Sequence, residues 1–80
     1  MNEMEKYRKE IKKGIYRHFK GNLYEVVDLA YDSETLRPKV VYRALYGERE
    51  MWVRDAGMWC ETVERDGAVM HRFELISEDK

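Results

Sequence analysis

Hydrophobic and polar positions follow a helical spacing at the start of the chain. The apolar positions recur at intervals of three and four residues, which puts them on one face of a helix: Met4, Tyr7 and Ile11. Asn2 can cap the first turn, and Glu5 stands three positions later, where a carboxylate completes a capping box. Gly14 suits the end of the helix, because glycine adopts the left-handed conformation without steric penalty. The pattern predicts a helix over residues 3–12.

The pattern then changes to short segments rich in Val, Tyr, Ile, Leu and Trp, which turn residues divide at intervals of about ten positions. The segments predicted as strands are residues 15–19, 23–31, 39–46, 51–54, 58–64 and 71–76. Two of the intervening pairs, Gly21-Asn22 and Asp66-Gly67, readily adopt the positive φ angles of a tight hairpin. The second part of the chain is therefore predicted to form an antiparallel β structure.

Five or six short strands in succession favour closure into a barrel, because closure removes exposed sheet edges from so small a domain. The predicted fold is mainly β with minor α content, in the form of a small, partly open antiparallel β-barrel with one N-terminal helix. We expect residues 1–13 to be the helical segment, residues 14–76 the barrel domain and residues 77–80 an acidic tail.

Composition limits what the chain can build. Its 80 residues make one domain with a small core, since a chain of this length buries only about 60–65% of its unfolded surface. Charged residues make up 39% of the chain and hydrophobic residues 44%, which is typical of a folded domain with a well solvated surface. No run of 18 apolar residues occurs, and the first residues lack the apolar stretch of a secretory signal. We therefore expect a soluble, cytoplasmic protein that does not enter a membrane.

Charge is distributed unevenly, although the net charge is only −1. Residues 1–20 hold seven Lys and Arg against three Glu, whereas residues 61–80 hold six acidic residues against three Lys and Arg. A lysine-rich surface usually serves solubility, and we favour this interpretation over a contact with phosphate. The opposite charges of the two ends could equally hold the termini together. The small net charge argues against non-specific binding of duplex DNA, which needs a broad basic surface.

Several segments in the same order resemble a known family: "GIYRHFKGNLYEV", "AYDSETLRP", "VVYRALYG", "WVR" and "ETVERDG" followed by "RFE". Through them, residues 14–76 resemble the small bacterial family known as domain of unknown function 1653. The resemblance implies a compact cytoplasmic domain with an SH3-like barrel and no assigned activity. The positions that match the family's pattern include Tyr16, Arg17, His18, Lys20, Gly21, Tyr24, Val26, Ser33, Glu34, Thr35, Val41, Tyr42, Arg43, Ala44, Leu45, Tyr46, Gly47, Trp52, Val53 and Arg54.

His18 is the residue that most invites a chemical interpretation. It shares one face of the predicted first strand with Tyr16, because side chains alternate along a strand, and the charges of Arg17 and Lys20 favour its neutral form. No carboxylate or nucleophile stands in a recognised catalytic arrangement with it, so we favour a structural or ligand-contacting role. The alternative is a small hydrolase or transferase that uses His18 as general base with a carboxylate helper.

Metal, cofactor and thiol chemistry are not expected. Cys60 is the single cysteine, and the two histidines are far apart in sequence, so neither an internal disulfide nor a zinc site is predicted. Cys60 has no neighbouring base and is predicted to be an inert core thiol. The glycine-rich phosphate loops and the nucleophile elbow are missing from the sequence, and no cofactor is expected.

Aromatic and arginine residues supply the remaining candidate site. Tyr, Trp and Arg are common anchors of recognition surfaces, because they provide a large contact area at little entropic cost. The same aromatic residues could simply fill a small core, and the sequence leaves both interpretations open. The residues that we expect to contact a ligand are Tyr16, His18, Arg43, Trp52 and Arg54. The expected function is that of a binding module whose partner is a peptide, a small anion, or a nucleotide or nucleic acid.

Overall fold

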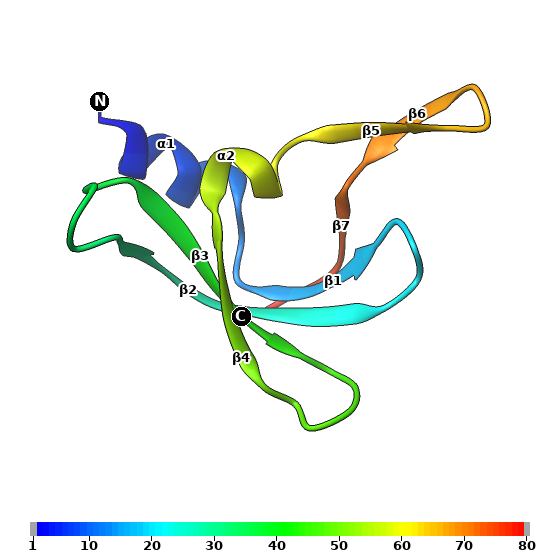
Figure 1. The fold of residues 1–80 in the computed structure, drawn as a ribbon, viewed down its shortest axis with the longest axis horizontal. Coiled ribbons are helices and arrows are strands. Elements are labelled where there is room, and N and C mark those ends of the chain that lie inside the picture. Colours follow the sequence, from blue (N-terminus) through cyan, green and yellow to red (C-terminus); the bar gives the residue numbers. More distant parts are fainter. Residues whose placement is uncertain (1, 80) are drawn as a thin grey trace.

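The N-terminal element is the predicted helix, seen in blue in a computed structural model that describes residues 2–79 (Figure 1). Helix α1 (Glu3–Glu10) begins at Asn2, whose side-chain oxygen accepts a hydrogen bond from the Glu5 N–H at 2.9 Å. The helix ends two residues earlier than predicted. The Ile11 N–H closes the last turn on the Tyr7 carbonyl at 2.7 Å, while the Ile11 backbone itself is extended.

Within residues 2–79, seven strands form two antiparallel sheets, one of order β4-β3-β2-β1-β7 and one that pairs β5 with β6. The strands are β1 (Gly14–His18), β2 (Leu23–Tyr31), β3 (Pro38–Ala44), β4 (Met51–Asp55), β5 (Thr62–Arg65), β6 (Ala68–His71) and β7 (Phe73–Glu78). A short helix, α2 (Ala56–Trp59), connects β4 to β5. Both helices lie on the same side of the bent large sheet, and the β5–β6 hairpin projects beyond it (Figure 1).

The outer limits of two predicted segments lie outside the described residues. These limits are Met1, which begins the predicted segment 1–13, and Lys80, which ends the predicted tail 77–80. Of that tail, Ser77 and Glu78 belong to β7. In the part of the chain that the structure describes, no helix is long and apolar enough to span a membrane.

The mainly β composition is confirmed, but the strand predicted over residues 58–64 is wrong in its first half. The Asp55 carboxylate accepts hydrogen bonds from the N–H groups of Gly57 and Met58, at 2.9 and 3.4 Å, and so starts α2. An aspartate is a strong N-cap, because its oxygen satisfies N–H groups that the first turn leaves unpaired. The apolar residues of "MWC" favour a strand by composition, and this capping interaction outweighs that preference.

The strand predicted over residues 71–76 is divided at Arg72. The Arg72 N–H donates to the Glu61 carbonyl at 3.0 Å, whereas its carbonyl accepts from the Phe19 N–H at 2.9 Å. At this residue the chain therefore leaves the neighbourhood of β5 and joins β1. The division places the β5–β6 hairpin directly beside the end of β1.

The large sheet is bent but does not close. Its edge strands are β4 and β7, and within residues 2–79 these two strands do not pair with each other. The predicted partly open barrel is therefore not confirmed, since the residues between β4 and β7 form α2 and a separate hairpin instead of closing the sheet. Register shifts between Val26 and Asp28, and between Ile15 and Tyr16, accompany the bend, as β-bulges generally do.

The two predicted hairpin turns are both present. Asp66 and Gly67 have φ angles of 53° and 80°, as the two central residues of a type I′ turn require. The first turn is wider than the predicted pair, because the His18 N–H donates to the Asn22 carbonyl at 2.8 Å and the Gly21 N–H donates back to the His18 carbonyl at 2.7 Å. The residues between these contacts, 19 and 20, therefore lie beyond the end of β1.

Strand register defines the buried side of the large sheet. Partners directly opposite each other across antiparallel strands point to the same side. The pairs that share this side, hereafter the inner face, are Tyr16 with Tyr24, Tyr42 with Trp52, Val40 with Arg54, and His18 with Phe73. The buried core cluster consists of Met4, Ile11, Tyr16, Val26, Leu29, Val40, Tyr42, Ala56, Trp59 and Phe73. Residues of both helices therefore pack against the inner face.

Gly14 opens β1 at a close crossing with β7, so its predicted role as the end of the helix is wrong. Its φ is 146°, and a Cβ atom at this position would lie 2.2 Å from the Ser77 carbonyl oxygen. The Asp79 N–H donates to the Lys13 carbonyl at 2.8 Å and holds the two segments together. Only glycine fits so close a backbone approach. The crossing sets the path of β7, which carries Phe73 to the inner face.

Candidate functional site

Aromatic rings cover the inner face around Phe73. The Phe73 ring stacks on Trp59 of α2, with centroids 3.7 Å apart and an interplanar angle of 1°. Tyr42 and Tyr16 meet the same indole edge-on, at centroid distances of 5.0 and 5.3 Å. Tyr24 meets Phe73 at 5.9 Å. Such ring pairs contribute about 0.5–1.5 kcal/mol each to stability beyond the burial of their area. The aromatic cluster therefore stabilises the packing of α2 and β7 on the inner face.

His18 and Arg54 both contact the Phe73 ring. The imidazole centroid lies 5.0 Å from it, and the Arg54 guanidinium carbon lies 5.5 Å from its centroid. The Nε atom of Arg54 is buried and has no hydrogen-bond partner among residues 2–79. Within that range Arg54 also forms no ion pair. A guanidinium in such surroundings gains from an anion, which supplies the acceptors it lacks.

The His18 imidazole is held in its neutral form. Its Nδ1 atom accepts a hydrogen bond from the Lys20 N–H at 3.2 Å, so the proton of the neutral ring is on Nε2. Burial lowers the pKa of His18 from its usual 6.5, and the positive charges of Arg54, Arg72 and Lys20 lower the pKa further. His18 therefore presents an N–H donor, whereas its basic lone pair is already engaged.

A cavity of about 370 Å³ lies beside His18, between the end of β1 and the β5–β6 hairpin. Its lining consists of Arg17, His18, Phe19, Met70, His71 and Glu74. Arg17 donates to the Glu74 carboxylate at 3.2 Å, and Arg72 nearby pairs with Glu61 at 3.5 Å. Each of these two arginines therefore has a carboxylate partner. The preference of the cavity for an anion or a cation then depends on the charged side chains nearby that have no such partner.

Positive charge also lies near this cavity, on side chains that do not themselves line it. The ammonium of Lys20 and the guanidinium of Arg65 lie 5.8 and 6.0 Å from the centroid of the Phe19 ring. Neither of them, nor Arg54, has an ion-pair partner in the described part of the chain. Three cations that lie near the rings of Phe19 and Phe73 favour an anion over a cation or a neutral polar group in this region.

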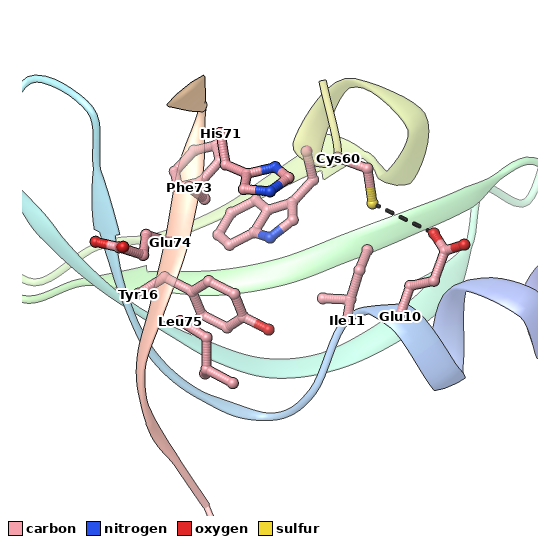
Figure 2. A pocket seen from close by; sticks show the side chains of 9 residues that line it. Glu10, Ile11, Tyr16, Cys60, His71, Phe73, Glu74 and Leu75 are labelled. Atoms are coloured by element: carbon pink, nitrogen blue, oxygen red, sulfur yellow. Dashed lines mark hydrogen bonds between the residues drawn. The ribbon is translucent and has the colours of Figure 1, made fainter. Parts of the chain in front are cut away.

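A second cavity, also of about 370 Å³, shares His71 and Glu74 with the first (Figure 2). It is lined by Glu10, Ile11, Tyr16, Trp59, Cys60, His71, Phe73, Glu74 and Leu75. Figure 2 shows the carboxylates of Glu10 and Glu74 on opposite sides of this cavity, with the Tyr16 ring between them. Glu74 lines both cavities, so it is the additional carboxylate of Glu10 that makes this cavity less suited to an anion than the one beside His18.

The thiol and the phenol of the second cavity are not reactive near neutral pH. The Cys60 thiol donates to Glu10 at 3.8 Å, and burial together with that carboxylate raises the pKa of Cys60 to about 11. The Tyr16 hydroxyl donates to the Lys12 carbonyl at 2.8 Å, and burial raises the pKa of Tyr16 to about 12. The predicted inertness of Cys60 agrees with this environment.

Three of the five residues expected to contact a ligand come together. Tyr16, His18 and Arg54 each contact a ring of the stacked Trp59–Phe73 pair. Tyr16 lines the second cavity and His18 the first, so the two residues face different cavities. The bend of the sheet brings Arg54 of β4 and His18 of β1 to the same ring, although two strands separate them in the sheet order.

The other two expected residues lie apart from this cluster. Trp52 is opposite Tyr42 on the inner face, but it belongs to the edge strand and is largely exposed. Arg43 is on the opposite face, and its guanidinium donates to the Arg49 carbonyl at 3.2 Å. Arg43 therefore cannot share a ligand with His18 and Arg54.

Sequence reasoning missed several residues that line the His18 cavity or contact His18 or Phe19, namely Phe19, Lys20, Arg65, Met70, His71 and Phe73. Most of them come from the β5–β6 hairpin and the start of β7, far from His18 along the chain. The segment "HRFE" has the alternation of a strand, but no local signal shows which strand it pairs with. The pairing of β7 with β1 is what brings these residues to His18.

These features define a small, mainly β protein with a bent open sheet and a cavity beside His18 near which Lys20, Arg54 and Arg65 lie. The chain belongs to the family described as protein of unknown function (DUF1653), whose model matches residues 14–75. The resemblance seen in the sequence is thereby confirmed. The crystal structure of a DUF1653 protein from Bordetella bronchiseptica is similar, with a TM-score of 0.81 and 32% identity over 90% of this chain and 95% of that chain. The comparison with curated proteins gave no match.

Proposed function

We propose that the protein is a binding module that takes an anionic ligand with a planar ring, of the nucleotide class, at the cavity beside His18. The observation that carries the proposal is the convergence of Lys20, Arg54 and Arg65, which have no ion-pair partners among residues 2–79, on the rings of Phe19 and Phe73. A phosphate satisfies such cations, and a base stacks on an aromatic wall.

The state of His18 supports binding over catalysis. A general base needs a free lone pair, and the Nδ1 lone pair of His18 already accepts the Lys20 N–H. No carboxylate of residues 2–79 forms an ion pair with His18 that could orient it. The Nε2–H is free to donate to an anionic oxygen, and a bound anion would raise the lowered pKa of His18. No observation favours the alternative of a hydrolase or transferase.

The size and charge of the site favour a small ligand or one nucleotide of a single strand. A volume of about 370 Å³ is at the lower end of the range for small-molecule sites. The net charge of −1 gives the whole domain little attraction for duplex nucleic acid. A peptide would have to bring its own carboxylate or phosphate to meet the same cations. The SH3-like relation of the bent sheet and the cytoplasmic location stay proposals, which rest on the family resemblance and on composition.

A titration followed by two-dimensional ¹H–¹⁵N NMR tests the proposed site. The probes are a nucleoside 5′-monophosphate, the corresponding nucleoside and inorganic phosphate. We expect the nucleotide to bind more tightly than either part alone and to shift the amide signals of Phe19, Lys20 and Phe73. Equal shifts over the whole surface, or no shifts up to millimolar nucleotide, would refute the proposal.

Two matched variants locate the contact. Arg54→Met removes the unpaired guanidinium and keeps an unbranched apolar stem, and we expect it to weaken nucleotide binding by about 10-fold or more, as loss of a charged anchor does. Arg43→Met is the control, because Arg43 lies on the other face of the same sheet. Equal weakening in both variants would show a general effect of net charge and would contradict the assigned site.

A further inference from the structure

Strand β4 is an uncovered edge of the large sheet, and it is unusually apolar for an edge. Three consecutive residues expose large apolar side chains: Met51 by 42%, Trp52 by 55% and Val53 by 64%. Edge strands usually carry charged residues, proline or bulges that prevent pairing with another chain. The other edge, β7, carries Glu74 and Glu78 on either side of its exposed Leu75 and Ile76. In β4 the charged residues, Arg54 and Asp55, stand together at one end, so the three apolar residues at the other end have no charge between them.

The backbone of β4 has its free hydrogen-bonding groups at Val53. The Ala44 N–H donates to the Glu50 carbonyl at 3.0 Å, so these two residues form a hydrogen-bonded pair between the strands. Hydrogen-bonded and non-hydrogen-bonded pairs alternate along an antiparallel ladder. The pair of Val53 with Val41 is three positions farther along and is therefore of the non-hydrogen-bonded kind. The N–H and C=O of Val53 point away from β3, toward the open edge.

We propose that β4 pairs antiparallel with β4 of a second copy of the chain, about a twofold axis at Val53. Val53 is the middle residue of β4, so this register uses the whole strand. The two copies of Val53 exchange both N–H···O=C bonds, and Trp52 of each copy stands opposite Arg54 of the other. The two large sheets become one continuous sheet. The inference goes beyond the proposed ligand site and does not depend on it.

Complementarity along β4 specifies a second copy as the occupant. A twofold axis at Val53 sets an aromatic ring opposite a cation at both flanking positions, which is a favourable cross-strand pair. An axis at Arg54 would set two guanidinium groups opposite each other. Pairing of β4 with the β7 edge of another copy would be a head-to-tail contact, which does not close into a dimer, and it would set apolar residues against acidic ones. The self-pairing of β4 closes and keeps the guanidinium groups apart, and its one unfavourable pair, Met51 opposite Asp55 of the other copy, falls at the ends of the strand.

Sedimentation equilibrium of the full chain over a wide concentration range tests the dimer. We expect the mass to rise with concentration from 9.7 kDa to twice that value. Val53→Lys sets two introduced lysines against each other at the axis and should weaken the dimer at least about 100-fold, since facing like charges strongly oppose association. Val69→Lys is the matched control, because Val69 is 68% exposed on β6, in the other sheet. This variant should dimerise like the unmodified protein.

A charge-swap experiment isolates the register. Val53→Lys and Val53→Glu should each be monomeric alone, and an equimolar mixture should form a heterodimer, because opposite charges then face each other at the axis. Circular dichroism checks that both variants are folded, as the exposure of Val53 leads us to expect. A monomeric unmodified chain at all concentrations, a dimer that survives Val53→Lys, or a mixture of the folded variants that stays monomeric would each overturn the proposal.

Discussion

Replacing Gly14 by alanine tests how the structure positions β7 against β1. The added Cβ would lie 2.2 Å from the Ser77 carbonyl oxygen and 2.9 Å from both the Asp79 nitrogen and the Glu78 Cα. All three are backbone atoms, so no side-chain rotation can relieve the contact. The φ of 146° is also one that an alanine rarely adopts. The strand must therefore move, or the crossing must open.

The cost has two parts. A residue with a side chain in so unfavourable a backbone region costs about 1–3 kcal/mol. Overpacking of a tight contact costs about 1–3 kcal/mol more. We therefore expect Gly14→Ala to lower the free energy of unfolding by roughly 2–6 kcal/mol. A domain of this length has a total of about 4–12 kcal/mol, so the variant should be close to unfolding.

Urea unfolding followed by tryptophan fluorescence measures the loss. Gly21→Ala is the matched control, since Gly21 has a φ of 110° but no atom of residues 2–79 would lie within 4 Å of an added Cβ. Both variants bear the backbone penalty and the same change in unfolded-state entropy, so their difference isolates the clash with β7. We expect Gly14→Ala to be less stable than Gly21→Ala by about 1–3 kcal/mol. Equal losses would mean that β7 does not cross β1 at Gly14.

Three further predictions follow from the pKa values of the partly buried Cys60 and His18. Because the pKa of Cys60 is raised from 9.0 to about 11, a thiol reagent at pH 8 should label the native protein about 100-fold more slowly than the denatured one. Glu10→Gln should speed labelling of the native protein. Equal native and denatured rates would show an exposed thiol. The pKa of His18 is lowered in the folded state, so stability should fall as the pH drops below the unfolded value of about 6.5. Arg54→Met should raise the pKa of His18 in an NMR titration, whereas an unchanged pKa would place Arg54 away from it.

Local patterns in the sequence predicted the elements whose cause is local. Helix α1 follows from the apolar spacing and the Asn2 cap, and the turn at Asp66-Gly67 follows from the conformations that this pair adopts. Helix α2 was missed because its cap, Asp55, stands at the end of an apolar strand and before residues of strand-like composition. The break at Arg72 depends on a change of partner strand, which no local pattern encodes.

The candidate site was predictable only in part. Alternation along β1 correctly put Tyr16 and His18 on one face, and alternation along β3 put Arg43 on the face opposite Tyr42. The bend of the sheet determines which face packs against the helices. The sequence alone therefore could not show whether Arg43 and His18 lie on the same face. The approach of Arg54 to Phe73 depends on the same bend.

The most direct test of the proposed function is a binding cycle measured by isothermal titration calorimetry. The affinities of a nucleoside 5′-monophosphate and of its nucleoside are compared for the unmodified protein and for Arg54→Met. If the ligand's phosphate contacts Arg54, removing the phosphate should lower the binding free energy more in the unmodified protein than in the variant. The difference is the coupling energy, which we expect to be about 1.5–3 kcal/mol, as for hydrogen bonds to charged groups. Equal costs in both proteins would contradict the assigned contact and, with it, the anion-binding role of this face.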